Sequence, residues 1–272
     1  MTTNNTLIYS EKSNGVAEIT LNRPEIRNAF DSQLIQKLIS TFKKAESSPS
    51  VRIILLKANG KHFSAGADLN WMRGMAQASY EENYEDAKQL ALLMSTINFI
   101  AKPVIAKVHG AAFGGAIGLI ACSDIVIADE AAKFSLSEVK LGLSPATISP
   151  YVIDAIGARS ARRLFLTGEV FNSEKALNLG LISEAIKTDK LDDEVNKIIG
   201  SLLKNGPIAL TKTKELIHRV DSETRDSLLI DYTCELIAEL RVSEEGQEGL
   251  SAFLEKRAPS WTHGLVTKGI KP

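Results

Sequence analysis

Residues 103–138 read PVIAKVHGAAFGGAIGLIACSDIVIADEAAKFSLSE, and the rest of the chain is organised around them. The apolar segment Val104–Val108 is typical of a short strand, and three glycines follow it in the next loop. That loop opens an apolar helical segment, Gly115–Cys122. Because the first N–H groups of a helix have no partner inside it, this loop is predicted to present free backbone donors.

A lone carboxylate stands at the end of the same stretch. Two short strands, at 125–128 and 132–136, are predicted to carry the chain to Glu138, whose neighbours are largely apolar. Such surroundings should raise the pKa of the carboxyl group and suit it to proton exchange near neutrality. Backbone donors opposite it would hold developing oxyanion charge while the carboxylate moves a proton.

The composition is that of an ordinary globular protein with a sizeable core. The chain has 272 residues, of which 44% are hydrophobic and 24% charged, and its net charge is −1. This balance favours neither nucleic acid nor an anionic membrane as a partner. The longest run without a formal charge, Val108–Ser123, is shorter than the roughly 20 residues that a membrane-spanning helix needs. The N-terminus has no signal-peptide pattern, so we expect a cytoplasmic protein.

The segments before residue 103 alternate between strand and helix patterns, as in an α/β fold. Asn14-Gly15 favours a tight hairpin turn between the first two strands. The third strand, Val51–Leu56, is nearly all apolar, which is typical of a strand buried on both faces. Strands are predicted at 7–12, 16–21 and 51–56, one helix is capped at 28–31 and ends before Pro49, and another covers 84–101.

Beyond Glu138 the strand and helix pattern recurs loosely and then gives way to helices alone. Predicted helices cover 150–156, 158–166 and 173–178, a strand covers 181–186, and four more helices cover 192–203, 207–220, 222–241 and 244–256. The last helices must bury their apolar stripes on the core or on other subunits, and an oligomer is expected. We therefore predict a core of ββα units at residues 1–205 and a C-terminal helical region at 206–272.

Several common catalytic and cofactor motifs do not occur in the sequence. There is no Gly-x-Ser-x-Gly elbow of a serine hydrolase. The four histidines and two cysteines never fall at metal-ligand spacing, so no metal site is predicted. The glycines around Gly115 match neither a dinucleotide fingerprint nor a P-loop. The candidate chemistry is limited to Glu138 and to the backbone N–H groups near Ala67 and Gly115.

Two small-residue loops, HFSAGAD at 62–68 and GAAFGG at 110–115, are followed by FSLSEV at 134–139. With LGLSP at 141–145 and GLSAFLEKR at 249–257, these motifs resemble the crotonase (enoyl-CoA hydratase/isomerase) superfamily. The resemblance covers nearly the whole chain. It implies an α/β fold, a crotonase-like spiral of ββα units with a C-terminal helical trimerisation region. It also implies a homotrimer or a homohexamer built as a dimer of trimers.

The same resemblance implies an acyl-CoA substrate and a role for individual residues. Coenzyme A would be present as part of the thioester substrate, with no separate bound cofactor. The N–H groups of Ala67 and Gly115 would form the oxyanion hole for the thioester carbonyl, and Glu138 would be the catalytic acid/base. The substrate and coenzyme A would also contact Arg27 near the phosphates, Ala65, Asp68 and Leu69 at the adenine, Gly114, and Phe253 and Lys256 from a neighbouring subunit.

Gly118 departs from one version of the family pattern. Hydratases of this superfamily with two carboxylates have a second glutamate three residues after the oxyanion glycine, and here that position is Gly118. Glycine has no side chain to orient or deprotonate a water molecule. One carboxylate can still move a proton from water to the α-carbon, or between the α- and γ-carbons. The number of carboxylates therefore does not decide between hydration and double-bond isomerisation.

Finer resemblance points to one group of hydratases. The segments 113–124, 134–138 and 68–72 look most similar to bacterial methylglutaconyl-CoA and carboxygeranoyl-CoA hydratases, which act in leucine and acyclic terpene breakdown. Such substrates carry their own carboxylate, for which Arg73, Lys140 or Arg159 is a candidate partner.

Three functions follow from the sequence. The first is hydration of a branched or carboxylated 2-enoyl-CoA, and the second is Δ3-Δ2-enoyl-CoA isomerisation by Glu138 alone. The third is a non-catalytic or RNA-binding role. RNA binding is disfavoured because the helix predicted at 84–101 has one lysine, Lys88, which Glu85 and Asp86 balance.

Overall fold

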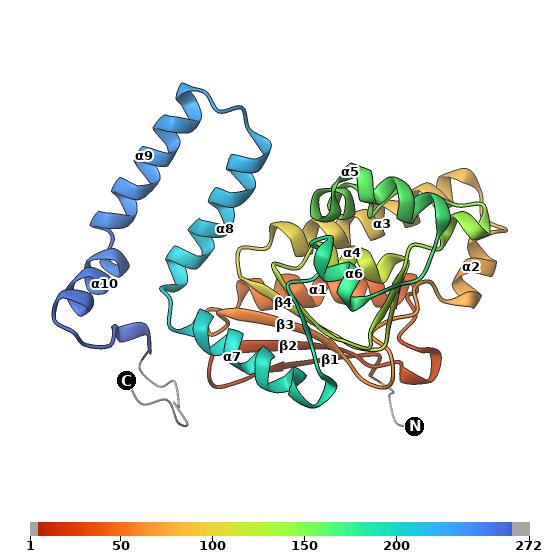
Figure 1. Cartoon of the computed structure of the whole chain (residues 1–272), viewed down its shortest axis with the longest axis horizontal. Helices are drawn as coiled ribbons and strands as arrows, with labels where there is room; N and C mark the ends of the chain where they lie inside the picture. Colours follow the sequence, from red (N-terminus) through yellow and green to blue (C-terminus); the bar gives the residue numbers. More distant parts are fainter. Residues whose placement is uncertain (1–4, 263–272) are drawn as a thin grey trace.

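A six-stranded sheet lies at the centre of the computed structural model, which describes residues 5–262 (Figure 1). The strand order is β1-β2-β3-β4-β6-β9, with β1 and β2 antiparallel and the remaining neighbours parallel. Predominantly parallel strands with helical crossovers confirm the predicted α/β class. The strands are β1 Leu7–Glu11, β2 Val16–Leu21, β3 Ile53–Ala58, β4 Val104–Val108, β6 Ile125–Asp129 and β9 Glu184–Ile186.

Both faces of this sheet are buried. In β3, Ile53 and Leu55 pack with α7 (Leu191–Leu203), whereas Ile54 and Leu56 belong to the main core on the opposite face. Successive side chains of a strand point to opposite faces, so an uninterrupted apolar strand serves two cores. This confirms the prediction for the third strand. The main core also contains residues of α1 Ser32–Ser47, α3 Tyr80–Phe99, α4 Gly115–Ala121 and α5 Ser149–Thr167.

A second, three-stranded sheet positions the glycine loop. It has the order β5-β7-β8, with β5 at Ala111–Phe113, β7 at Lys133–Ser135 and β8 at Phe171–Asn172. β7 lies within the strand predicted at 132–136, whereas β5 falls in a segment predicted to be a loop and β8 was not predicted. Segments of two or three residues are too short to show an alternating pattern, and their strand geometry comes from pairing with distant segments.

Two helices begin at positions other than those predicted. α3 starts at Tyr80 rather than Tyr84, because Ser79 and Glu82 form a reciprocal capping box. Its first turn is polar, so the amphipathic pattern alone does not reveal it. The later helix expected from Ser222 starts instead as α9 (Ser227–Val242), where the Asp226 side chain caps its first turn.

The last three helices form an arm that extends away from the core (Figure 1). They are α8 (Pro207–Ser222), α9 and α10 (Glu244–Leu254). Glu245 of α10 accepts hydrogen bonds from the N–H groups of Ile208 and Ala209 in the first turn of α8. These bonds connect the last helix of the arm to the first. The division predicted at 205/206 stays a prediction, and residues 263–272 lie outside the described residues. No helix among residues 5–262 is long and apolar enough to cross a membrane.

Candidate active site

The first oxyanion candidate, Ala67, lies in a loop that pairs with the segment preceding α1. Phe30 donates its N–H to the Gly66 carbonyl and accepts the Asp68 N–H, each at 2.7 Å. In such a parallel bridge the N–H of the opposed residue points away from the partner strand. The Ala67 N–H therefore faces away from Phe30, and it has no hydrogen-bond acceptor among residues 5–262.

The second candidate, Gly115, is the first residue of α4. The preceding Gly114 has a φ of 55°, in the region that favours glycine, and donates its own N–H to the Ser135 carbonyl at 2.9 Å. The Gly115 N–H comes too early in the helix for an intrahelical acceptor, and the described residues provide no other.

Glycines at 66 and 114 bring the two loops and Glu138 together. A Cβ atom on Gly66 would lie 3.0 Å from the Phe113 carbonyl oxygen. A Cβ atom on Gly114 would lie 3.2 Å from Oε1 of Glu138 and 4.0 Å from Cα of Gly66. The structure thus places the Glu138 carboxyl group at the junction of the Ala67 and Gly115 loops. These two residues are separated by 47 residues in the sequence, yet the backbones of their loops are in contact.

Glu138 is partly buried beside the glycine loop. It opens the 3-10 turn η2 (Glu138–Leu141), and its Oε2 atom is buried with no hydrogen-bond partner among the described residues. Burial raises the pKa of this carboxyl group, and a backbone hydrogen bond opposes the rise in part. A carboxyl group with a raised pKa suits proton transfer close to neutrality, as the apolar sequence context predicted.

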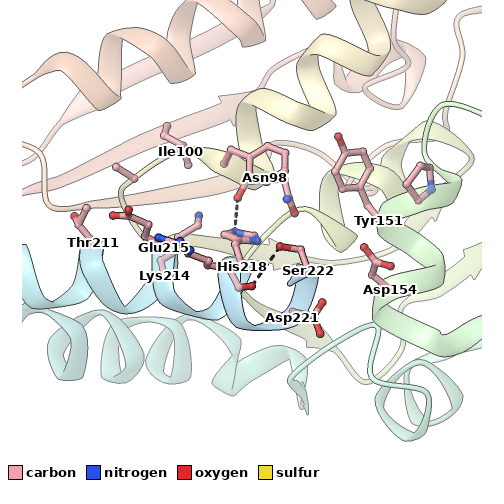
Figure 2. A pocket seen from close by; sticks show the side chains of 14 residues that line it. Asn98, Ile100, Tyr151, Asp154, Thr211, Lys214, Glu215, His218, Asp221 and Ser222 are labelled. Atoms are coloured by element: carbon pink, nitrogen blue, oxygen red, sulfur yellow. Dashed lines mark hydrogen bonds between the residues drawn. The ribbon is translucent and has the colours of Figure 1, made fainter. Parts of the chain in front are cut away.

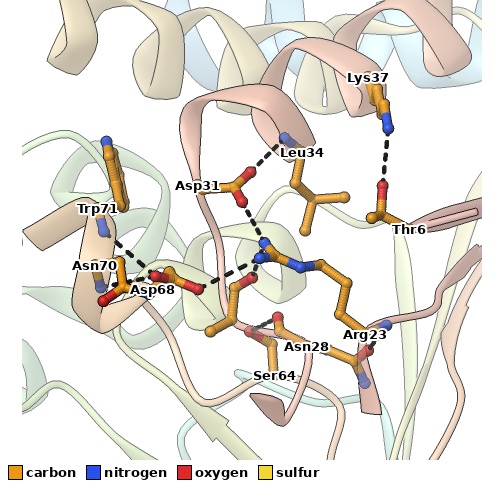
Figure 3. Close-up of polar contacts among 11 residues, drawn as sticks. Thr6, Arg23, Asn28, Asp31, Leu34, Lys37, Ser64, Asp68, Asn70 and Trp71 are labelled. Atoms are coloured by element: carbon orange, nitrogen blue, oxygen red, sulfur yellow. Dashed lines mark hydrogen bonds and ion pairs between the residues drawn. The ribbon is translucent and has the colours of Figure 1, made fainter. Parts of the chain in front are cut away.

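An arginine that the sequence did not single out, Arg23, holds the Ala67 loop in place (Figure 3). Arg23 forms ion pairs with Asp31 at 2.6 Å and Asp68 at 3.3 Å. Asp68 also caps α2 (Leu69–Met75), because its side chain accepts the N–H groups of Asn70 and Trp71. The Asp68 carboxylate therefore fixes the loop, and its predicted contact with coenzyme A stays a prediction.

Asn28 and Ser64 complete this support (Figure 3). Asn28 is buried with a φ of 53°, and its side chain accepts the Arg23 N–H and donates to the carbonyls of Asn59 and His62. The Ser64 hydroxyl donates to the Asn28 carbonyl at 2.8 Å and accepts the Gly66 N–H at 3.2 Å. Neither residue was singled out from the sequence. In the sequence, Asn28 looks like part of the cap of the following helix. Its role in supporting the loop becomes visible only from its hydrogen bonds to Asn59 and His62, which are distant in the sequence.

The position of the missing second carboxylate is filled by core side chains. A Cβ atom on Gly118 would lie 2.4 Å from Cγ2 of Ile148 and 2.7 Å from Sδ of Met94. Both of these side chains are fully buried. Any side chain at position 118 would have to displace them, so this packing leaves no room at position 118 for a second carboxylate.

The residues predicted to bind coenzyme A fall into two groups. Arg27 is exposed and its carbonyl accepts the Ala65 N–H at 2.9 Å, so these two residues are neighbours beside the Ala67 loop. Leu69 is 69% exposed at the start of α2. Phe253 instead lies in the last turn of α10 and Lys256 lies two residues beyond it, and Figure 1 places α10 at the opposite end of the molecule from α2. The structure does not bring these last two residues to the site within one chain.

A cavity of about 730 Å³ lies elsewhere, where α8 leaves the core (Figure 2). Its walls come from the end of α3, the start of α5 and one side of α8, including Tyr151, Asp154 and His218. None of the predicted site residues lines it. Lys214 of α8, which also lines the cavity, pairs with Asp124 of the core at 2.7 Å and attaches the arm to the core. Within residues 5–262 no group of three His, Cys, Asp or Glu residues is placed to hold a metal ion.

Comparison with known proteins agrees with this geometry. Residues 11–264 match the family described as Enoyl-CoA hydratase/isomerase. The crystal structure of an enoyl-CoA hydratase from Shewanella pealeana is 49% identical, has a TM-score of 0.91, and is aligned over 95% of this chain and 97% of that chain.

Curated relatives include both reaction types. The 2,3-dehydroadipyl-CoA hydratase of Escherichia coli K12 is 31% identical over 245 residues, which are 89% of this chain and 93% of that protein. The trans-2-decenoyl-(acyl-carrier-protein) isomerase of Streptococcus mutans is 31% identical over 254 residues, or 92% and 95%. The chain belongs to the enoyl-CoA hydratase/isomerase family of the crotonase superfamily.

Proposed function

We propose that this protein hydrates a 2-enoyl-CoA through an enolate, with Glu138 as the acid/base. One observation carries the proposal: the partly buried Glu138 carboxyl group lies at the junction of two loops whose Ala67 and Gly115 N–H groups have no acceptor among the described residues. Two donors aimed at a thioester carbonyl would stabilise the charge that develops on its oxygen. Coenzyme A enters only as part of the substrate, and no separate cofactor takes part.

The proposed reaction needs one proton carrier. Glu138 takes a proton from water as the water oxygen bonds to the β-carbon. The electron pair of the C=C bond moves into an enolate, whose oxygen accepts hydrogen bonds from Ala67 and Gly115. The protonated Glu138 then delivers its proton to the α-carbon, and the carboxylate is regenerated. A raised pKa supports both halves of this cycle, because the group must gain and lose the proton near neutrality.

Isomerisation of a Δ3-enoyl-CoA is the second candidate. The packing of Ile148 and Met94 against Gly118 favours it, because a site with one carboxylate lacks a second group to orient water. Glu138 would then remove an α-proton and return it at the γ-carbon. The S. mutans relative named as an isomerase supports this alternative, and the E. coli relative named as a hydratase supports the first.

For the acyl group we propose a branched or carboxylated substrate of the methylglutaconyl-CoA type. Of the three candidate cations, Lys140 lies in the same turn as Glu138 and is exposed. Arg73 donates instead to Asn70, and Arg159 lies along α5 in a groove with other basic side chains. The position of Lys140 supports it as the partner of a substrate carboxylate.

We further propose that the chain assembles as a homotrimer or a homohexamer. Phe253 and Lys256 would then approach the coenzyme A end of a neighbouring site. The arm supports this assembly, because large apolar side chains of α9 and α10 are exposed in the single chain, among them Leu228, Val242, Phe253 and Leu254.

A panel of enoyl-CoA thioesters with mass spectrometry of the products tests the reaction. Gain of one water by methylglutaconyl-CoA supports hydration, a shifted double bond at constant mass supports isomerisation, and no turnover of any thioester contradicts both. With an active substrate, Glu138→Gln should lower kcat by roughly 10²-fold or more, since it removes the acid/base. Lys140→Ala should raise KM for the carboxylated substrate and leave that for crotonyl-CoA little changed.

A further inference from the structure

His62 lies before the Ala67 loop, and its side chain reaches the glycine loop. Between these two segments, Ser64 donates its N–H to the Ala111 carbonyl and Phe113 donates its N–H to the Ser64 carbonyl, each at 3.0 Å. Phe63 donates to the His109 carbonyl at 2.9 Å. This short parallel ladder holds β5 beside the Ala67 loop, and β5 leads directly to Gly114 and Gly115.

One rung of the ladder uses a side chain in place of the backbone. In a regular parallel ladder continued from the Ser64–Ala112 bridge, the carbonyl of residue 62 would accept the Ala111 N–H. That carbonyl instead accepts the Asn28 side-chain amide at 2.9 Å. The Ala111 N–H donates to Nδ1 of the His62 imidazole at 3.1 Å. A nitrogen that accepts a hydrogen bond must be unprotonated, so the ring is neutral with its proton on Nε2.

Gly110 allows this close approach. Its φ is +64°, and a Cβ atom there would lie 2.9 Å from Nδ1 of His62 and 2.0 Å from the Lys61 carbonyl oxygen. A side chain at position 110 would push the ring away from the Ala111 N–H. The glycine and the histidine therefore act together to close the ladder at the start of β5.

The charges around His62 disfavour its protonated form. The charged and titratable groups that act on it come from three segments: Arg27 after η1 (Pro24–Ile26), Lys61 beside it and His109 at the end of β4, and none of them is acidic. Burial is the largest cause that lowers the pKa of His62 below the ordinary value of 6.5, followed by Arg27, His109 and Lys61. The ring is therefore neutral at neutral pH and gains a proton only in acid.

We propose that His62 is a positioning residue of the oxyanion hole, holding the start of β5 through its unprotonated Nδ1 and releasing it on protonation. A protonated Nδ1 carries an N–H that faces the Ala111 N–H, so the bond is replaced by two opposed donors. The first rung of the ladder then opens, and the Gly115 N–H, four residues along the backbone, loses its support. This role in catalysis rests on the proposed function, whereas the coupling between the two loops does not.

NMR of the full-length protein tests the coupling without any substrate. Two-bond ¹H–¹⁵N imidazole spectra should show His62 protonated on Nε2 at neutral pH. The backbone amide signals of Ala111 and Gly115 should shift with the same midpoint as the His62 ring, below pH 6.5. In His62→Asn, which replaces Nδ1 with a non-titrating amide oxygen, these shifts should disappear. A ring protonated on Nδ1 at neutral pH, or a Gly115 amide that does not follow His62, overturns the proposal.

Kinetics with an active thioester tests the consequence for catalysis. His62→Leu should lower kcat by roughly 10- to 100-fold and change KM less than kcat. The reason is that misplaced oxyanion-hole N–H groups stabilise the transition state less well, while binding of the substrate is little affected. His62→Asn should restore most of this loss and should retain activity at a lower pH than the wild type does. Titration of Glu138 affects wild type and His62→Asn alike, so the difference between their pH profiles of activity reports the titration of His62.

His218 provides a control for this experiment. His218→Gln alters a histidine of α8 whose ring contacts the Asn98 carbonyl, and it should leave the pH profile unchanged. Identical pH profiles for wild type and His62→Asn would show a purely structural histidine and overturn the proposal. If no thioester is turned over, the proposed function fails, and the NMR titration alone decides whether His62 couples the loops.

Discussion

At the scale of single residues, the environment that suits the Glu138 carboxyl group to proton transfer also lowers the stability of the folded protein when this group is charged. Its Oε2 atom has no hydrogen-bond partner among residues 5–262, and burial raises its pKa above the ordinary 4.5. A raised pKa means that the folded protein holds this proton more tightly than the unfolded chain does. The neutral form thus favours folding at low pH, and this contribution is lost as pH rises through the folded-state pKa.

Glu138→Gln should therefore raise the melting temperature at neutral pH, where the wild type must bury a charge. Below pH 4.5, where the carboxyl group is protonated in both states, the difference should become small. Thermal unfolding followed by circular dichroism at several pH values measures it. A variant no more stable than the wild type at neutral pH would show that water or another group satisfies the carboxylate.

Gly118 can be tested against another helical glycine. Gly118→Ala should destabilise the protein by roughly 1–3 kcal/mol, because the new methyl group collides with Ile148 and Met94 in a packed core. Gly200 of α7 has no atom within 4 Å of the corresponding position, so Gly200→Ala should stabilise by roughly 0.5–1 kcal/mol. Urea unfolding measures both changes. Equal effects at the two positions would contradict the packing described around Gly118.

At the scale of elements, the Ala67 loop owes its shape to polar contacts made by segments before and after it. Arg23 connects the cap of α1 (Asp31) to the cap of α2 (Asp68). Arg23→Met should leave both carboxylates without their cation and lower stability by roughly 1–3 kcal/mol. It should also lower kcat, since the Ala67 N–H would lose its orientation.

The matched control is Lys197→Met, which removes an exposed ion pair with Glu194 on α7. This change should have little effect on unfolding or on kcat, because exposed pairs are screened by solvent. Urea unfolding and steady-state kinetics of the two variants provide the comparison. If Arg23→Met behaved like the control, the clamp would have no role in holding the loop.

At the scale of the whole molecule, the arm is poorly covered by its own chain. α8 is attached through Lys214 and Asp124, while Leu228 and Ile230 of α9 are 72% and 61% exposed. Exposed apolar surface of this kind favours association. Light scattering after size exclusion should give three or six times the 29.5 kDa chain mass.

Leu228→Lys should shift the assembly towards the single chain, because it places a charge in the proposed interface. The control is Leu166→Lys, which changes an exposed residue of α5, outside the arm. This change should leave the assembly unchanged. A wild-type protein with the mass of one chain would refute the proposed assembly, and with it the contribution of Phe253 and Lys256 to a neighbouring site.

The sequence by itself determined the α/β class, most strand and helix positions, and the three positions that meet at the candidate site. It did so because apolar alternation, caps and glycine turns depend on near neighbours in the chain. The starts of α3 and α9 and the strands β5 and β8 were not predictable in this way, since polar first turns and two- or three-residue strands carry no periodic signal.

Only the tertiary structure decided how the site is supported. The contacts of His62 with Ala111, of Arg23 with Asp68, and of Ile148 and Met94 with Gly118 join residues far apart in the sequence. Their geometry depends on how sheets and helices pack, and no local pattern encodes it. In the stretch at 103–138, the sequence therefore located the glycine loop and Glu138. Packing decided that Gly118 lies against the side chains of Ile148 and Met94, and that the start of β5 is held by His62 from another loop.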